Sequence, residues 1–456
     1  MLIVGENDFH IAPLFQEGRF GQKQYFLNIV KKTYAINDDE GFLEPIPKAD
    51  QPGIAGPTMY EDDLGRSLMY PGDIDTQKPL VDVVINGCAF APGGDPVTEL
   101  GVSVDIAGRR KTLRVFGNRR WEKNEAGEVN ISDTEPFTKM PIRWEKAFGY
   151  LNNRQNPLGM GKEQDHETDP ENPVYSLPNV ENPTELITQF GQEVRPVGFS
   201  AISESWEPRQ SLFGTRSAYW ANFRAPLPPK DQDVRYHNAA PEDQQFEELN
   251  GDEVIKFTNF HERLSDLSIK LPGIKPRLFY VPNMRKEEEE QSLELIETPL
   301  VLDTVVIDLN EKLLTLVWRG HLDASNTAVM EKFYYLYAVE DTFSPSITID
   351  EIQSKFNEDV KDIDLSRQSL ELDPETLKIG LMAPVVAEIV KTLTQVEADP
   401  AFIAQIAAET DPKSLQNRLE AEFNKVATKA KTDLEQQQAK MDKFNAESKP
   451  STSGNI

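Results

Sequence analysis

Apolar and polar residues alternate most clearly between residues 101 and 117. On both sides of the tripeptide Gly108-Arg109-Arg110, every second residue is apolar, as expected for strands that bury one face. Glycine and polar residues between two such runs favour a tight turn. We therefore predict a β-hairpin with one buried face, whose apolar positions are Val102, Val104, Ile106, Leu113 and Val115.

A second pair of strand-like runs, residues 304–309 and 313–318, is separated by Asn310-Glu311-Lys312. β-Branched and aromatic residues flank these polar turn residues, which again predicts a hairpin. Up to about residue 345, proline and glycine recur at short intervals between brief runs rich in Val, Ile, Phe and Tyr. This texture is typical of β-structure. It does not give the strand order, so a sandwich-like fold and an irregular barrel are equally open.

Prolines are dense between about residues 150 and 245. Long helices cannot continue through such a segment, so we predict loops and short strands there. Long loops in a compact protein often form binding surfaces, but these loops could equally wrap the core. We assign residues 1–330 to a mainly β region, which the loops of 150–245 could divide into two subdomains.

A helical pattern replaces the β pattern after Ser344. Apolar residues recur every three or four positions, which predicts an appended helical region over 345–445, and residues 446–456 are polar enough to be disordered. The fold class is therefore α+β. The apolar stripe could pack on the chain itself, on a second copy or on a foreign partner; its residues include Leu377, Leu381, Val385, Ile389, Leu393, Leu415, Leu419, Phe423, Val426, Ala430 and Leu434.

Length and composition limit the class of protein. A chain of 456 residues predicts two or three domains. The single cysteine, Cys88, excludes an intramolecular disulfide and a thiolate zinc cluster, so the cytoplasm is the expected compartment. The N-terminus has no basic segment followed by a long apolar one, and no run approaches the roughly 20 apolar residues that cross a bilayer. We expect neither an export signal nor membrane insertion.

The charge balance changes the expected partners. The chain carries 76 acidic and 48 basic side chains, a formal net charge of −28. Such a charge repels phosphate backbones and anionic lipids, so we expect no nucleic-acid partner. It favours a basic protein or a divalent cation, unless the carboxylates serve only solubility.

The residues of common catalytic and metal sites are poorly placed. Cys88 follows an apolar run with no partner base in the pattern, and we expect a small buried core residue. The five histidines are scattered without the spacing of paired metal ligands. The turn Gly93-Gly94 lies between prolines, and Gly159-Met160-Gly161-Lys162 lacks the spacing of a phosphate loop, so neither predicts a nucleotide site. We expect no catalytic residue, metal or cofactor.

Carboxylates leave one enzymatic alternative. A glycosidase-like hydrolase needs two of them a few ångströms apart across a cleft, a separation that the sequence does not give. The acidic run of residues 287–290 is most simply a solvated loop.

Aromatic and arginine residues gather in four turn-rich segments. Trp, Tyr and Arg dominate the binding energy of protein interfaces. The same residue types also pin loops to a core through cation–π and carboxylate contacts, and the pattern does not separate the two. The segments are Arg119-Arg120-Trp121, Arg143-Trp144, Trp206-Glu207-Pro208-Arg209 and Tyr219-Trp220-Ala221-Asn222-Phe223-Arg224.

An ordered series of short motifs over roughly residues 10–325 resembles the bacterial domain of unknown function 2169. Each motif alone is weak, whereas the series in this order is specific. The motifs are Val81-Asp82-Val83-Val84-Ile85-Asn86-Gly87, Ala91-Pro92-Gly93-Gly94, Lys111-Thr112-Leu113-Arg114-Val115-Phe116-Gly117, Pro136-Phe137-Thr138-Lys139-Met140-Pro141, Trp144-Glu145-Lys146-Ala147-Phe148-Gly149, Asn156-Pro157-Leu158-Gly159, Leu177-Pro178-Asn179, Pro196-Val197-Gly198-Phe199, Trp206-Glu207-Pro208-Arg209, residues 235–245 from Arg235-Tyr236-His237-Asn238, and Val317-Trp318-Arg319-Gly320.

The resemblance implies a function rather than an active site. Members of this family are typically encoded in type VI secretion clusters beside PAAR-type spike-tip proteins and toxins, and are understood as adaptors that stabilise an effector and help to dock it on the spike. The family brings no catalytic residues. This chain departs from the expected pattern at Asn118, where an aspartate would precede Arg119, and at Tyr150, where a second glycine often follows Gly149.

We therefore expect an adaptor or chaperone that covers exposed surface of a type VI effector or a PAAR-type spike-tip protein before loading. The alternatives are a hydrolase with carboxylates converging in the Pro-rich region and an immunity protein that blocks a toxin. The C-terminal helices could contribute self-association. The expected partner contacts are Trp206, Arg209, Trp220, Phe223 and Arg224.

Overall fold

β-Strands make up most of the described chain, and helices are few. The computed structural model describes residues 2–4, 7–17, 24–37, 41–162, 175–223, 228–282, 295–323 and 334–359, with the single residues 402, 405, 406, 418 and 421. The chain divides into two compact units, Met1–Ile363 and Asp364–Ile456, and the elements below belong to the first. Most of the helical region predicted for 345–445 and all of the tail predicted for 446–456 lie outside the described residues.

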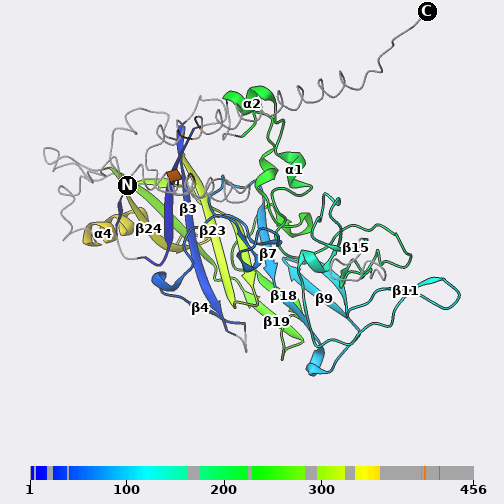
Figure 1. Ribbon diagram of the computed structural model, residues 1–456. Helices are drawn as coiled ribbons and strands as arrows, with labels where there is room; N and C mark the ends of the chain where they lie inside the picture. Colours follow the sequence, from blue (N-terminus) through cyan, green and yellow to red (C-terminus); the bar gives the residue numbers. More distant parts are fainter. Residues whose placement is uncertain are drawn as a thin grey trace, which may run out of the picture. The chain divides into compact units, whose positions relative to one another are not determined.

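The largest sheet has seven strands and is centred on the long strands β3 and β23 (Figure 1). β22 and β23 form the hairpin predicted from the second alternating pattern, which is confirmed. β22 also pairs in parallel with β7, more than 200 residues earlier in the chain. The strand order is β17 (Gln245–Phe246), β7 (Val81–Asn86), β22 (Val301–Asp308), β23 (Leu313–Asp323), β3 (Gln24–Ile36) and β2 (His10–Glu17), with β4 (Leu43–Pro45) also on β3.

A five-stranded sheet contains the other predicted hairpin, β9–β10, which is confirmed in register from Ile106 opposite Arg109 to Glu99 opposite Phe116. The turn is Ala107-Gly108 rather than the predicted Gly108-Arg109-Arg110, because Arg109 and Arg110 already pair with Ile106 and Asp105. The φ values of Ala107 and Gly108 are 49° and 79°. Two positive φ values are those of the tight turns that match the twist of paired strands. The strand order is β16 (Val180–Glu181), β10 (Arg109–Phe116), β9 (Glu99–Ile106), β18 (Val254–Thr258) and β19 (Asp266–Lys270).

A four-stranded sheet carries the longest described helix, α4 (Ile349–Asp359). Thr348 and Glu351 exchange hydrogen bonds at the start of α4, the reciprocal arrangement of a capping box. Phe356 is buried against the ring of Tyr337 in β24, with centroids 5.2 Å apart. β24 and α4 therefore belong to the first unit, which ends at Ile363. The strand order is β1 (Leu2–Val4), β24 (Tyr334–Thr342), β20 (Ile274–Pro282) and β21 (Ile296–Thr298).

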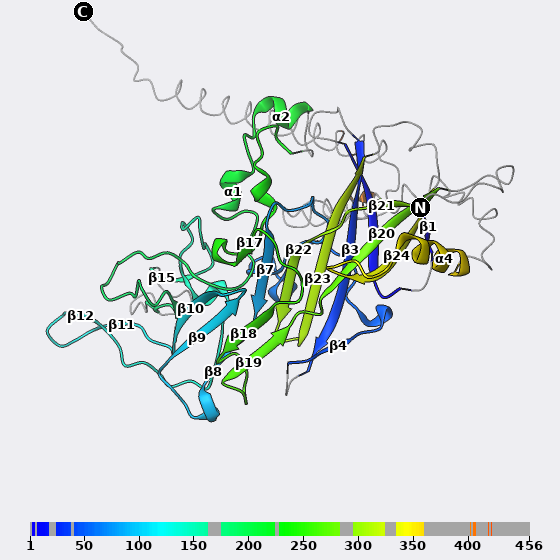
Figure 2. The ribbon, with the colours of Figure 1, turned by 180° about the vertical axis from the view of Figure 1, so that it is seen from behind.

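Short elements decorate these sheets. The β11–β12 hairpin lies at the end of the first unit opposite to α4 (Figure 2). The described parts of the Pro-rich region contain no long helix, as predicted, but they include short helices besides the predicted loops and short strands. The remaining strands are β5 (Thr58–Met59), β6 (Leu68–Tyr70), β8 (Cys88–Phe90), β11 (Trp121–Lys123), β12 (Val129–Ile131), β13 (Lys139–Pro141), β14 (Phe148–Gly149) and β15 (Met160–Gly161). The short helices are α1 (Arg209–Leu212), α2 (Ala218–Phe223) and the 3-10 turns η1 (Lys48–Asp50), η2 (Tyr60–Asp62), η3 (Pro92–Gly94), η4 (Trp144–Lys146), η5 (Val234–His237) and η6 (Glu242–Gln244).

One buried core joins strands of all three larger sheets, for example Val30 of β3, Val104 of β9 and Leu278 of β20. Each of these sheets ends in two edge strands, so none of the described sheets closes into a barrel. The chain is thus mainly β with layered, open sheets. Within the described ranges, no helix is long and apolar enough to cross a membrane.

Candidate functional site

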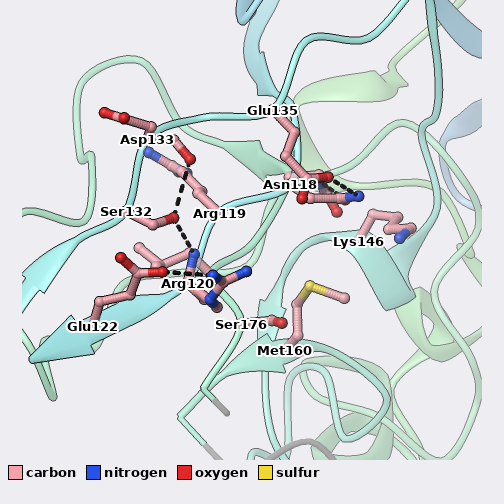
Figure 3. Close-up of a pocket in the computed structure, with 12 residues that line it drawn as sticks. Asn118, Arg119, Arg120, Glu122, Ser132, Asp133, Glu135, Lys146, Met160 and Ser176 are labelled. Atoms are coloured by element: carbon pink, nitrogen blue, oxygen red, sulfur yellow. Dashed lines mark hydrogen bonds and ion pairs between the residues drawn. The ribbon is translucent and has the colours of Figure 1, made fainter.

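A polar hollow of about 560 Å³ opens beside the β11–β12 hairpin (Figure 3). It lies among the segments that the sequence analysis selected for their arginine and aromatic residues. Three chain segments, residues 118–135, 146–160 and 176–179, contribute to its wall. The lining residues are Asn118, Arg119, Arg120, Glu122, Ser132, Asp133, Glu135, Lys146, Met160, Ser176, Leu177 and Asn179.

The alternation of β11 decides which side chains face the hollow. Arg120 and Glu122 line it, whereas Trp121 between them is buried in a cluster with Phe148 and Ile187. The backbone of residue 121 donates to the carbonyl of Tyr175 at 2.9 Å, which fixes this wall to the segment after residue 174. A Cβ on Gly117 would overlap the carbonyl oxygen of Glu135, so only glycine permits the two ends of this segment to approach.

Arg119 is 92% buried at the hollow and is held from three sides. Its guanidinium lies 3.6 Å from the ring centroid of Phe116, forms an ion pair with the buried carboxylate of Glu181 and donates to the carbonyl of Pro178 at 3.2 Å. Burial lowers the pKa of Arg119, and Glu181 opposes that shift. Burial likewise raises the pKa of Glu181 against the effect of Arg119. Within the described residues, the Nε of Arg119 has no hydrogen-bond partner.

Some of the charged side chains around Arg119 already form an ion pair or a hydrogen bond with a neighbour. Arg120 pairs with Glu122 at 2.6 Å, and Asn118 donates to Glu135 at 3.1 Å (Figure 3). Among the described residues, no ion pair engages the side chains of Asp133 and Lys146. The hollow therefore combines an uncommitted cation, an uncommitted carboxylate and a buried N–H donor.

Two of the predicted partner contacts are buried residues. Trp206 is 5% exposed and packs edge-to-face on Trp144 with centroids 6.1 Å apart. Arg209 is 4% exposed and donates to the carbonyls of Ile202 and Tyr236 at 2.8 and 2.9 Å. Both side chains hold the Pro-rich segment on the core in this structure. That they contact a partner stays a prediction.

The other three predicted contacts lie in or after α2. Trp220 is half-buried and packs edge-to-face on Phe213, with centroids 5.8 Å apart. Phe223 ends α2, but its side chain lies outside the described residues, as does all of Arg224. Trp220 does not line the hollow beside β11.

Most of the polar residues in the family-like motifs satisfy buried backbone groups. Asn156 donates to the carbonyls of Trp144 and Phe148, and Gln244 donates to those of Val83 and Phe199. Buried polar groups of this kind specify where a loop sits. The motifs therefore mark the loop framework rather than a cluster of reactive groups.

A buried ionic network on the seven-stranded sheet has the same character. Lys78 pairs with Asp82 at 2.8 Å, and Asp82 also accepts from the backbone of residue 239 at 2.7 Å. Arg319 pairs with Asp303 and donates to the carbonyl of Asp73 at 2.7 Å. These charges are all buried and compensate one another. We expect the network to stabilise the packing of residues 73–82 on the sheet.

The cysteine, the glycine turn and the possible metal ligands considered from the sequence can also be located in the structure. Cys88 is a buried core residue, as predicted, and burial raises the pKa of its thiol. Gly93 and Gly94 form a tight turn with positive φ, as predicted. The described part of the chain contains no group of three His, Cys, Asp or Glu side chains that could hold a metal, and His166 and the acidic run of 287–290 lie outside it.

The two departures from the family pattern have simple explanations. The partner of Arg119 is Glu181, 62 residues later, so a neutral Asn118 does not leave the arginine without a carboxylate. Tyr150 packs against Phe148 and lies under the Nζ of Lys162, 4.5 Å from the ring centroid. A Cβ at the preceding residue, Gly149, would overlap the carbonyl oxygen of Asn156, so the structure requires glycine at position 149.

The sequence pattern does not identify the hollow as a site, although Arg119-Arg120-Trp121 stands out in it. The signal was available in that tripeptide, but its partners Glu181 and Ser176 come from a segment more than 50 residues away.

Comparison with known proteins gives one result. A family model described as an uncharacterized protein conserved in bacteria, DUF2169, matches residues 21–319. No curated protein and no solved structure matches the chain. The matched range covers more than half of the chain and contains the hollow, so the protein belongs to the DUF2169 family of uncharacterized bacterial proteins.

Proposed function

We propose that this protein is a cytoplasmic, non-catalytic adaptor that binds and stabilises a type VI secretion effector or a PAAR-type spike-tip protein and promotes its loading on the spike. The observation that carries the proposal is the hollow beside β11, where Asp133, Lys146 and the buried Nε of Arg119 are uncommitted within the described residues. Hydrogen-bond donors and an acceptor that are held in fixed positions suit recognition of another polypeptide.

The proposed mechanism is binding alone. The adaptor holds its client in a folded state by mass action, because a ligand that binds only the folded form stabilises it. With a net charge of −28, it attracts a basic client surface over a longer range than the contacts themselves. The buried polar residues that hold the loops, such as Asn156 and Gln244, keep the binding surface in place.

Co-expression tests the proposal directly. The protein is produced with the tagged effector or spike-tip protein encoded beside it, and the complex is purified through the tag. We expect co-elution at fixed stoichiometry and a client that precipitates when it is produced alone. A client that is soluble alone and does not associate would contradict the proposal.

The same experiment separates two alternatives. The carboxylates of Glu122, Asp133 and Glu135 all line the hollow, the one observation that favours a hydrolase. A hydrolase would act on a substrate without retaining a client. An immunity protein would protect a cell that produces the toxin alone, whereas loss of an adaptor would abolish secretion and leave self-protection unchanged.

A further inference from the structure

The floor of the hollow presents a hydrogen-bond donor that lacks an acceptor. Arg119 is buried, and its other described contacts use Nη2 and the face of the guanidinium. The Nε–H has no partner among the described residues. An unmade hydrogen bond at a buried donor is unfavourable, so a small shift of the Arg119 side chain that brings its Nε–H to an acceptor in the hollow is favoured.

The rim of the hollow is acidic. Of the five carboxylates between Trp121 and Glu135, three line the hollow, those of Glu122, Asp133 and Glu135. Glu122 is neutralised by Arg120, while Asp133 has no ion pair among the described residues and Glu135 accepts only from a neutral amide. A cationic group that lies beside Asp133 and Glu135 is therefore favoured.

An extended polypeptide segment carries both of the required groups. Its main-chain carbonyls are acceptors, and a lysine or arginine supplies the cation at the end of a flexible chain. Charge-assisted bonds from such a side chain to carboxylates are the strong type. The Nζ of Lys146 on the facing wall is a second donor for main-chain carbonyls.

We infer that the hollow binds an extended segment of the client that bears a lysine or arginine. A client carbonyl accepts from Arg119 Nε, and the basic side chain lies between Asp133 and Glu135. The inference rests on the proposed adaptor function, because it names the part of the client that the site recognises.

A charge reversal at the rim tests the inference in the full-length protein with its co-purified client. Asp133→Lys replaces an exposed carboxylate, so folding should be unaffected. Glu125→Lys makes the same charge change on the same hairpin, at an exposed turn position that does not line the hollow. We expect Asp133→Lys to weaken client binding roughly tenfold or more and Glu125→Lys to change it less than about twofold. The measurement is a binding titration with circular dichroism as the folding control.

Peptides identify the recognised segment. Overlapping short peptides of the client are titrated against the full-length protein by fluorescence anisotropy. We expect the binding peptides to contain a lysine or arginine, and its replacement by glutamine to abolish binding to the wild type.

The outcomes separate the two proposals. Equal affinity of Asp133→Lys and Glu125→Lys, or tight peptides without a basic residue, overturns the inference while leaving a client-binding adaptor intact. A client that fails to bind the wild-type protein removes both proposals.

Discussion

At the scale of single residues, the Arg119–Glu181 pair shows how a charged group is held inside this fold. Arg119 is 8% exposed and Glu181 is 1% exposed, and the shifts of both pKa values show that burial opposes their charged forms. Glu181 also accepts from the backbone of residue 187 at 2.7 Å. The pair thus ties β16 to the end of β10 and fixes the floor of the hollow.

Replacing Glu181 with glutamine should strongly destabilise the protein. The variant leaves the cation of Arg119 buried without a counter-charge, which typically costs about 3–5 kcal/mol of unfolding free energy. The measurement is urea denaturation at neutral pH. The control is Glu185→Gln: Glu185 lies 3.9 Å from a largely exposed Arg195, and its loss should cost less than about 1 kcal/mol. Equal midpoints for the two variants would show that Arg119 does not depend on Glu181.

Trp206 should likewise matter for folding rather than for binding. Its side chain is buried between Trp144 and the Pro-rich segment. Trp206→Ala should therefore lower the unfolding free energy by about 3–5 kcal/mol. Client affinity, measured by titration at a temperature where the variant is still folded, should stay near the wild-type value. A large loss of affinity in the folded variant would instead support the prediction that Trp206 contacts the partner.

At the scale of elements, the β9–β10 turn carries a residue that is poorly suited to its backbone. Ala107 has a φ of 49°, a region that asparagine tolerates better than alanine. We expect Ala107→Asn to raise the unfolding free energy by about 0.5–1 kcal/mol. Gly108→Ala, at a φ of 79°, should lower it by a similar amount. Urea midpoints with unchanged slopes would measure both. A destabilised Ala107→Asn would contradict the turn geometry.

The connection from β24 to α4 should make stability depend on pH. Burial raises the pKa of Asp341, but hydrogen bonds from Ser346, Thr342 and Ile347 more than offset this and hold it below its usual value. A carboxyl whose folded pKa is depressed stabilises the fold above its unfolded value, near pH 4, and that contribution is lost as the pH falls through the folded pKa.

Asp341→Asn should therefore cost about 1–2 kcal/mol at neutral pH. The difference from the wild type should shrink when the pH is lowered from 6 towards 3, because protonation of Asp341 removes the same interactions. Chemical denaturation over this pH range measures the difference. A difference that is constant with pH would mean that the carboxylate charge plays no part in holding the turn.

The elements that the sequence predicts well are those whose pairing is local. Both hairpins could be located because alternation and turn residues occur within one short segment. The parallel pairing of β7 with β22 and of β1 with β24 could not, because nothing in a local pattern names a partner hundreds of residues away. For the same reason, the sequence does not predict the Arg119–Glu181 pair or the hollow beside it.

At the scale of the whole molecule, the motif series is explained by packing. Motif residues from five separate segments satisfy one another's backbone groups around one core, because Asn156 donates to the carbonyl of Trp144 and Gln244 to those of Val83 and Phe199. A sequence shows that Trp, Arg and Asn recur in such segments, but not whether their side chains point inward. This is why Trp206 and Arg209 resembled interface residues: the residue types that anchor an interface also anchor a loop.

The C-terminal limit of the first compact unit predicts how two truncated forms of the protein behave. A protein ending after Ile363 keeps β24 and α4, whereas one ending at 330 loses both, exposes the edge of β20 and uncovers the apolar residues that Leu336 and Phe356 now contact. We expect the longer form to be monodisperse by light scattering and the shorter form to aggregate, because an unpaired apolar strand edge is a template for association.

The longer form also tests where the client binds. If the client docks at the hollow beside β11, removal of residues after Ile363 should change its affinity less than about threefold, which is under 1 kcal/mol. Loss of binding in a folded 1–363 protein would place the essential contacts in the second unit. In that case Asp133→Lys should have no effect on the full-length protein, so the two experiments check each other.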